Sequence, residues 1–107
     1  MKDGIYFVVF SNGQNDFGAG TVVVKDNTVN GGDFGFTYQG KVNGRKLELR
    51  VTQHNPQAQN VIPGLKNYSI DLTVNDSANG YQLSGSVIGI NGANLLVDAK
   101  RIGDLTV

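Results

Sequence analysis

Short stretches in which every second residue is apolar run along most of this chain. Within residues 46–54 the apolar positions are Leu47, Leu49 and Val51, and residues 67–75 repeat the pattern. Because successive side chains of a β-strand point to opposite faces, a period of two predicts strands with one face in a core and the other in water. The longer period of an amphipathic helix does not appear. The sequence therefore predicts an all-β protein.

Residue pairs suited to tight turns separate these stretches. The pairs with the chemistry of a hairpin turn are Asp26-Asn27, Asn43-Gly44, Asn79-Gly80 and Asn91-Gly92. The predicted strands cover residues 4–10, 19–25, 28–31, 34–42, 46–54, 67–75, 80–88 and 94–102. Strands joined mostly by hairpins predict an eight-stranded antiparallel up-and-down barrel that forms a single domain over residues 1–107. A two-sheet sandwich is the alternative, although its crossovers need longer connections.

One predicted connection, residues 55–66, is much longer than the others. It contains both prolines of the chain and the apolar residues Val61 and Ile62. Because a proline cannot donate to a sheet ladder, this segment is predicted to be a loop. Its apolar residues either fold back over one end of the barrel or contact a protein partner.

The first predicted strand is apolar on both faces. A barrel strand that faces water should be polar at alternate positions, so the outer face of this strand is expected to be covered. The cover is either a second copy of the chain or the long loop, and we favour a homodimer. Our candidate residues for the dimer face are Tyr6, Val8 and Phe10.

Composition excludes several classes of function. Nine basic and nine acidic residues balance, whereas a protein that grips nucleic acid through its phosphates carries a basic excess. We therefore expect no direct contact with nucleic acid. No segment reaches the ~20 apolar residues of a membrane span, and the apolar run 5–10 is too short for a secretory signal. We expect a cytoplasmic protein without a membrane partner.

Catalytic and metal chemistry are also poorly represented. The chain has no cysteine and a single histidine, His54, so thiolate and two-histidine metal sites are not available. Glu48 and Asp71 lie on outward strand faces, where carboxylates are usually solvated or paired. The glycine stretches 18–20 and 30–33 do not open a helix, and they are interpreted as strand starts and turns, not phosphate loops. We expect no enzyme activity, metal or cofactor.

The interior of an eight-stranded barrel is just wide enough for side chains or one small ligand. Candidate residues for a cavity lining are Phe34, Phe36, Tyr38, Leu49, Val51, Tyr68, Ile70 and Leu72. Such a lining would suit an apolar small molecule, and the chain would then be a carrier or sensor. The simpler alternative is that these side chains fill the interior completely.

Four segments resemble the GrlR-like family of negative regulators of type III secretion. They are Met1-Lys-Asp-Gly-Ile-Tyr6, Asn30-Gly-Gly-Asp33, Tyr38-Gln-Gly40 and Val97-Asp-Ala-Lys100, and the resemblance extends over nearly the whole chain. It implies a small cytoplasmic, dimeric barrel similar to the lipocalins and fatty-acid-binding proteins, which belong to the calycins. It also implies repression by capture of a helix-turn-helix transcriptional activator. In the family this contact is attributed to an acidic Glu-Asp-Glu-Asp loop after the Tyr-Gln-Gly segment.

The corresponding loop of this chain, residues 43–46, is shorter and basic. Arg45 and Lys46 would repel the basic DNA-binding face that an acidic loop attracts. They are therefore candidate contacts to an acidic partner, together with Val61 and Ile62, unless the tip is simply solvated. We expect a non-enzymatic regulatory binding protein that holds a transcriptional regulator; the alternative is a carrier or sensor of an apolar ligand.

Overall fold

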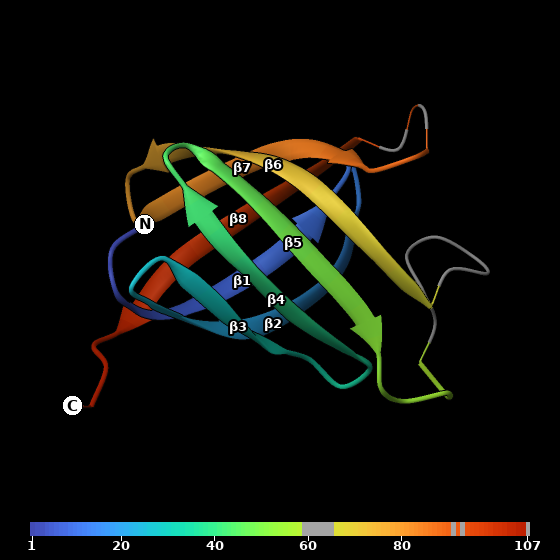
Figure 1. Cartoon of the computed structure of the whole chain (residues 1–107), viewed down its shortest axis with the longest axis horizontal. Coiled ribbons are helices and arrows are strands. Elements are labelled where there is room, and N and C mark those ends of the chain that lie inside the picture. The colour runs from blue at the N-terminus through green and yellow to red at the C-terminus, as the bar shows by residue number, and fades with distance from the viewer. Residues whose placement is uncertain (59–65, 91, 93, 107) are drawn as a thin grey trace.

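A computed structural model describes residues 1–58, 66–90, 92 and 94–106 of the protein. Eight strands close into one antiparallel barrel in the order of the chain (Figure 1). The strands are β1 (Gly4–Ser11), β2 (Asp16–Lys25), β3 (Thr28–Gly32), β4 (Phe36–Asn43), β5 (Lys46–Gln53), β6 (Asn67–Ser77), β7 (Gly80–Val87) and β8 (Asn94–Gly103). The ring closes where β1 pairs with β8. The predicted fold is confirmed.

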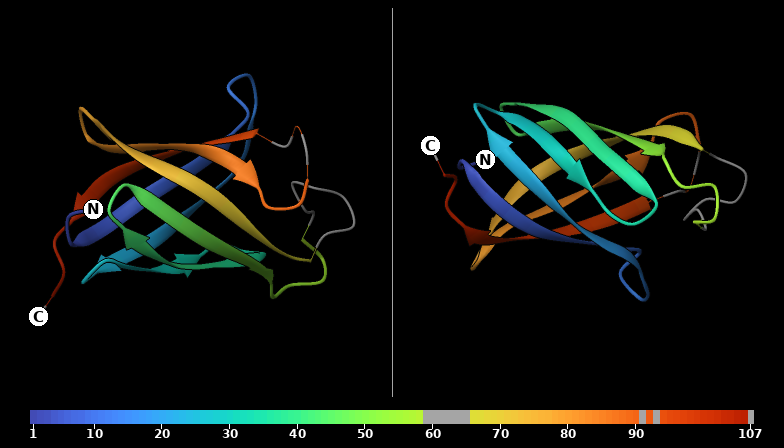
Figure 2. Two further views of the ribbon diagram at one scale, coloured as in Figure 1. Left: turned by 45° about the horizontal axis from the view of Figure 1, so that its top comes forward. Right: turned by 90° about the horizontal axis from the view of Figure 1, so that it is seen from below.

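Two-residue turns join β2 to β3, β4 to β5 and β6 to β7 at one end of the barrel, whereas the connections at the other end are longer (Figure 2). Between β2 and β3, Asp26 and Asn27 have φ angles of 51° and 62°, as a two-residue turn of type I′ requires. Between β4 and β5, Asn43 pairs with Lys46, so the central turn residues are Gly44 and Arg45. This turn lies one residue further along the chain than the prediction.

The start of β4 also differs from the prediction. One carboxylate oxygen of Asp33, Oδ1, accepts hydrogen bonds of 2.8 Å from the backbone N–H groups of Gly35 and Phe36. This local turn holds residues 33–35 out of the sheet, as aspartate side chains commonly do. Phe34, predicted to be in the strand, therefore lies in the preceding loop with 75% of its surface exposed.

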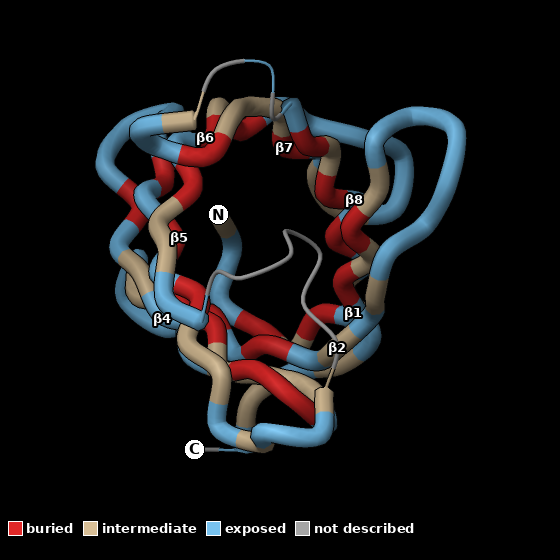
Figure 3. Tube along the Cα trace, turned by 90° about the vertical axis from the view of Figure 1, so that its right-hand side faces the viewer, coloured by how far each residue is buried: buried red, intermediate tan, exposed pale blue. Residues whose placement is uncertain are grey.

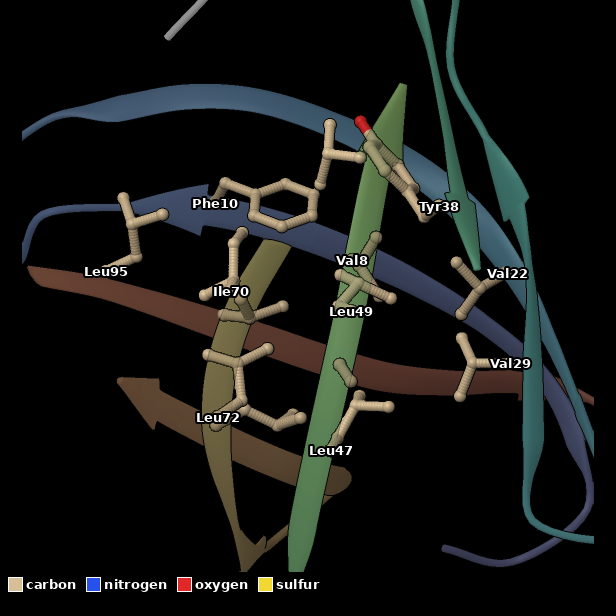
Figure 4. Packing of buried hydrophobic residues seen from close by; sticks show 14 of the residues in the cluster. Val8, Phe10, Val22, Val29, Tyr38, Leu47, Leu49, Ile70, Leu72 and Leu95 are labelled. Carbon is tan, nitrogen blue, oxygen red and sulfur yellow. The ribbon is translucent and has the colours of Figure 1, made fainter. Parts of the chain in front are cut away.

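The core consists of the inward-facing side chains of all eight strands (Figure 4). Tyr6, Leu72 and Val24 have no exposed surface at all. Within the described residues, no polar or charged side chain is buried. Burial of apolar surface is therefore the main source of stability, at roughly 25 cal/mol per Å² removed from water.

Inward-facing glycines allow neighbouring strands to approach very closely. At Gly20 a Cβ atom would lie 2.7 Å from the carbonyl oxygen of Gly32, and at Gly31, Gly40 and Gly85 it would overlap a carbonyl oxygen of the adjacent strand even more. Glycine inside a strand typically marks a tight bend or a close backbone approach. These positions let the sheet curve enough to close.

The N-terminal residues occupy one end of the barrel. Met1 packs against the core, and the Tyr6 hydroxyl donates a hydrogen bond of 2.5 Å to the carbonyl oxygen of Lys2. The guanidinium of Arg101 in β8 donates two hydrogen bonds, of 3.1 and 2.8 Å, to the carbonyl oxygen of Asp3. The Arg101 side chain thus joins β8 to the residues just before β1, in addition to the ladder between the two strands.

Candidate functional site

A partly open chamber of about 380 Å³ lies at the other end of the barrel. Figure 3 looks onto this end, with the strands arranged as a ring and the N-terminus at the far side. The described residues that line the chamber are Phe10, Phe17, Gly18, Ala19, Asp33, Phe34, Gly35, Phe36, Tyr38, Val51, Gln57, Ala58, Tyr68 and Leu95. Its volume is within the range of roughly 300–1,000 Å³ that is typical of small-molecule sites.

The structure places the predicted cavity residues at different depths. Those that line the chamber are Phe34, Phe36, Tyr38, Val51 and Tyr68. Leu49 and Leu72 lie deeper, around an apolar void of about 20 Å³, and Ile70 is packed in the core with 1% of its surface exposed. Side chains therefore fill the deeper part of the interior but not the end where the chamber lies.

Gly18 of β2 lines the chamber and leaves an inward position without a side chain, and Gly20 is a second inward glycine on the same strand. A Cβ atom at Gly18 would meet nothing within 4 Å, whereas at Gly20 it would press against the Gly32 carbonyl oxygen. Gly20 is thus required by the backbone approach, but Gly18 is not. Two glycines at alternate strand positions could have signalled this space in the sequence, where they were interpreted only as the start of a strand.

Asp33 contributes the one acidic side chain among the described lining residues. Its Oδ2 atom accepts a hydrogen bond from the Tyr38 hydroxyl, while Oδ1 serves the loop. Burial and this carboxylate raise the pKa of Tyr38 above its ordinary value. Burial and the Asp33 charge likewise raise the pKa of Tyr68 to about 12. None of the described lining residues is basic, so the chamber wall is aromatic with a negative edge.

Potential metal-binding side chains do not cluster in the described part of the chain. No three His, Cys, Asp or Glu residues gather there in a way that could hold a metal ion. The Nε2 atom of His54 lies 2.9 Å from the backbone carbonyl oxygen of Asp33. The ring thus contacts the loop beside the chamber and has an exposed position.

The basic hairpin tip between β4 and β5 is ordered by contacts with β6. Arg45 Nε and Nη2 donate hydrogen bonds of 3.3 and 3.2 Å to the Val74 carbonyl oxygen and to Asn75 Oδ1. Lys46 Nζ lies 3.4 Å from Asp71 Oδ1, with both side chains more than half exposed. The tip is therefore a positioned, solvent-facing pair of cations. The other candidate contacts, Val61 and Ile62, lie outside the described residues.

The predicted dimer face was assigned to the wrong side of β1. Tyr6, Val8 and Phe10 are 0%, 4% and 6% exposed and point into the barrel. Buried side chains cannot contact a second copy. Period-two patterning cannot decide which face is inward when both faces are apolar.

The outward face of β1 carries Ile5, Phe7 and Val9. Phe7 is 41% exposed, and Val23 of β2, which pairs with Ile5, is 39% exposed. On the other side of β1, Ile102 of β8 is 54% exposed. These five residues, which we call the β1 strip, form an apolar outer surface across three adjacent strands. The apolar outer face that was expected on β1 therefore consists of Ile5, Phe7 and Val9, and not of Tyr6, Val8 and Phe10.

Comparison with known proteins identifies a family. A family model described as the T3SS negative regulator GrlR matches residues 1–105. A search of the curated proteins finds no match. The described residues include no helix that is both long and apolar enough to traverse a bilayer.

Proposed function

Because the chain belongs to the GrlR family of negative regulators of type III secretion, we propose that it is a cytoplasmic regulator that acts by holding a transcriptional regulator protein. The observation that carries this proposal is the family match over residues 1–105.

We propose that the partner contacts the Arg45–Lys46 tip. Both cations are exposed and positioned by hydrogen bonds or an ion pair with β6. Charges held in place before binding lose less conformational freedom on association than mobile ones do. Positive charge attracts an acidic surface and repels a basic one, so the partner surface is acidic.

Affinity capture of the tagged protein from its own cells, followed by mass spectrometry, tests this proposal. A transcriptional regulator should be recovered with the wild-type chain and be lost with Arg45→Glu/Lys46→Glu. A matched control, Lys25→Glu/Lys66→Glu, changes the net charge equally on exposed residues elsewhere and should retain the partner. Recovery of the protein alone would contradict capture, and unchanged recovery by the first variant would exclude the tip.

We also propose that the regulator is a homodimer joined through the β1 strip. Lys100 of β8 pairs with Phe7, and Asp98 pairs with Val9, so opposite charges border the strip. A two-fold axis near this border would bring Lys100 of each copy opposite Asp98 of the other. Such an arrangement is self-complementary, as a symmetric interface must be.

The molar mass in solution tests the dimer. Light scattering coupled to size exclusion should give twice the chain mass for wild type and the single-chain mass for Phe7→Glu. Ile88→Glu is the control, because Ile88 is 51% exposed but lies outside the β1 strip. A monomeric wild-type protein, or a dimeric Phe7→Glu variant, would contradict the proposal.

A further inference from the structure

The open space at Gly18 is not explained by the packing of the barrel. A Cβ atom there would meet nothing within 4 Å, and the backbone does not have the positive φ that favours glycine. Glycine in a strand interior is destabilising by roughly 0.5–1 kcal/mol relative to alanine. Glycine in a strand can also mark a site that a ligand approaches closely. A ligand in the chamber would account for the open space beside Gly18.

The walls around this space have a definite chemical character. The rings of Phe10 and Tyr38 lie 5.0 Å apart at an angle of 54°, which gives a tilted aromatic pair at the chamber wall. Phe36 and Tyr68 add further aromatic surface. The only charge among the described lining residues is the Asp33 carboxylate. Its hydrogen bonds with two backbone N–H groups and with Tyr38 leave acceptor capacity, since a carboxylate has about four lone-pair sites.

We propose that the chamber binds a compact aromatic molecule bearing an amine, with the ammonium group beside Asp33 and the ring against the aromatic wall. This binding is separate from capture of a protein partner at the Arg45–Lys46 tip. It does not depend on that capture being correct.

The charge of the chamber selects a cation over an anion. No described lining residue could neutralise a carboxylate or phosphate group, and Asp33 would repel one. The raised pKa of Tyr68, about 12, agrees with this, because burial and Asp33 both disfavour added negative charge there. An ammonium group gains a charge-assisted hydrogen bond and attraction to the ring faces.

The depth of the chamber selects a compact ligand. Beyond the chamber the interior is filled, with a void of only about 20 Å³ around residues such as Leu49 and Leu72. A long acyl chain could not extend along the barrel axis without displacing these buried side chains. A bicyclic aromatic ring is short enough for the chamber, and its flat face can pack against the aromatic wall.

Three probes that share one ring and differ only in charge test the proposal by isothermal titration calorimetry at neutral pH. They are naphthylmethylammonium, naphthylmethanol and naphthoate. The ammonium compound should bind more tightly than naphthoate by at least about tenfold, with the neutral alcohol between them. Equal or tighter binding of naphthoate would overturn the proposal, and so would the absence of binding by all three probes.

Two variants test whether the ligand binds beside Gly18 and whether Asp33 sets the preference for a cation. Gly18→Leu places a side chain in the open space, where a Cβ atom would meet nothing within 4 Å, and should abolish binding. Thr21→Leu, at an outward position on the same strand, should leave binding unchanged. Asp33→Asn retains an oxygen for the loop turn and should reduce the preference for the ammonium compound to less than about twofold. Circular dichroism confirms folding of each variant. Unchanged binding by folded Gly18→Leu, or an unchanged preference in folded Asp33→Asn, would overturn the proposal.

Discussion

Replacing Gly85 with alanine should destabilise the barrel far more than a single methyl group suggests. Gly85 lies inward on β7 and pairs with Leu72 of β6. A Cβ atom there would overlap the carbonyl oxygen of Asp71 and lie 3.0 Å from the Leu72 Cα atom. Both are backbone atoms, so no side-chain rotation can relieve the overlap. The two strands must move apart.

The loss of stability can be worked out from the separation of the two strands. Separating β6 from β7 by about 1 Å would lengthen nearby N–H···O distances from about 2.9 to about 3.9 Å, beyond hydrogen-bonding range. Two lost ladder bonds cost about 1 kcal/mol each. Leu72 and Leu83, now 0% and 2% exposed, would lose packing worth about another 1 kcal/mol. The expected loss is about 2–4 kcal/mol, a large part of the roughly 5–15 kcal/mol that stabilises a typical domain.

Urea unfolding followed by tyrosine fluorescence measures this loss, because the chain has four tyrosines and no tryptophan. Gly18→Ala is the matched control, since its new methyl group enters open space. That variant should be unchanged or more stable by about 0.4–1 kcal/mol, as the unfolded chain becomes less flexible. A Gly85→Ala variant within about 1 kcal/mol of wild type would refute the argument from close strand approach.

Three further outcomes are expected. Burial raises the pKa of Tyr6 and Tyr68 from 10.0 to about 12. The folded state therefore binds these two protons more tightly than the unfolded state does. The free energy of unfolding should consequently fall as the pH rises from 10 to 12. Stability measured in urea across that range checks the sign. Arg101→Met removes the hydrogen bonds that hold the N-terminal residues, and amide exchange at the start of β1 should accelerate, with a loss of about 1–2 kcal/mol. Leu72→Ala should cost about 3–4 kcal/mol by thermal or urea unfolding, and Leu95→Ala less, because its lost volume joins an existing chamber.

Strand positions were predictable because apolar and polar residues alternate in the sequence wherever one face of a strand is exposed to water. The sequence placed β5 at residues 46–54, and the strand is Lys46–Gln53. The same rule failed on β1, where Tyr6 and Phe7 are equally apolar. The inward face there is decided by register, since Tyr6 pairs with the buried Val22 of β2. Pairing between strands cannot be obtained from the pattern of one strand alone.

The chamber was only partly predictable for a related reason. Aromatic residues of β4 were expected to line a cavity, and Phe36 and Tyr38 do line the chamber. Its polar edge was not expected, because Asp33 was interpreted only as part of a glycine-rich turn. The Oδ2 atom of Asp33 acquires its contact through Tyr38, which lies beyond the turn in the following strand. The contact between Asp33 in the loop and Tyr38 in the strand depends on the residue at which β4 begins. Strand boundaries are the least certain part of a pattern-based prediction.

The pairing of β1 with β8 also determines when the barrel can form during synthesis. The hydrogen bonds between Arg101 and Asp3 join residues 98 positions apart, so closure must wait until β8 has been made. Contacts this distant in sequence slow folding, because a long loop has to close before the contact forms. Until then, β1 presents unpaired backbone groups to other nascent chains. Loss of the final strand would therefore leave two permanent open edges, on β1 and β7, and each is a template for aggregation.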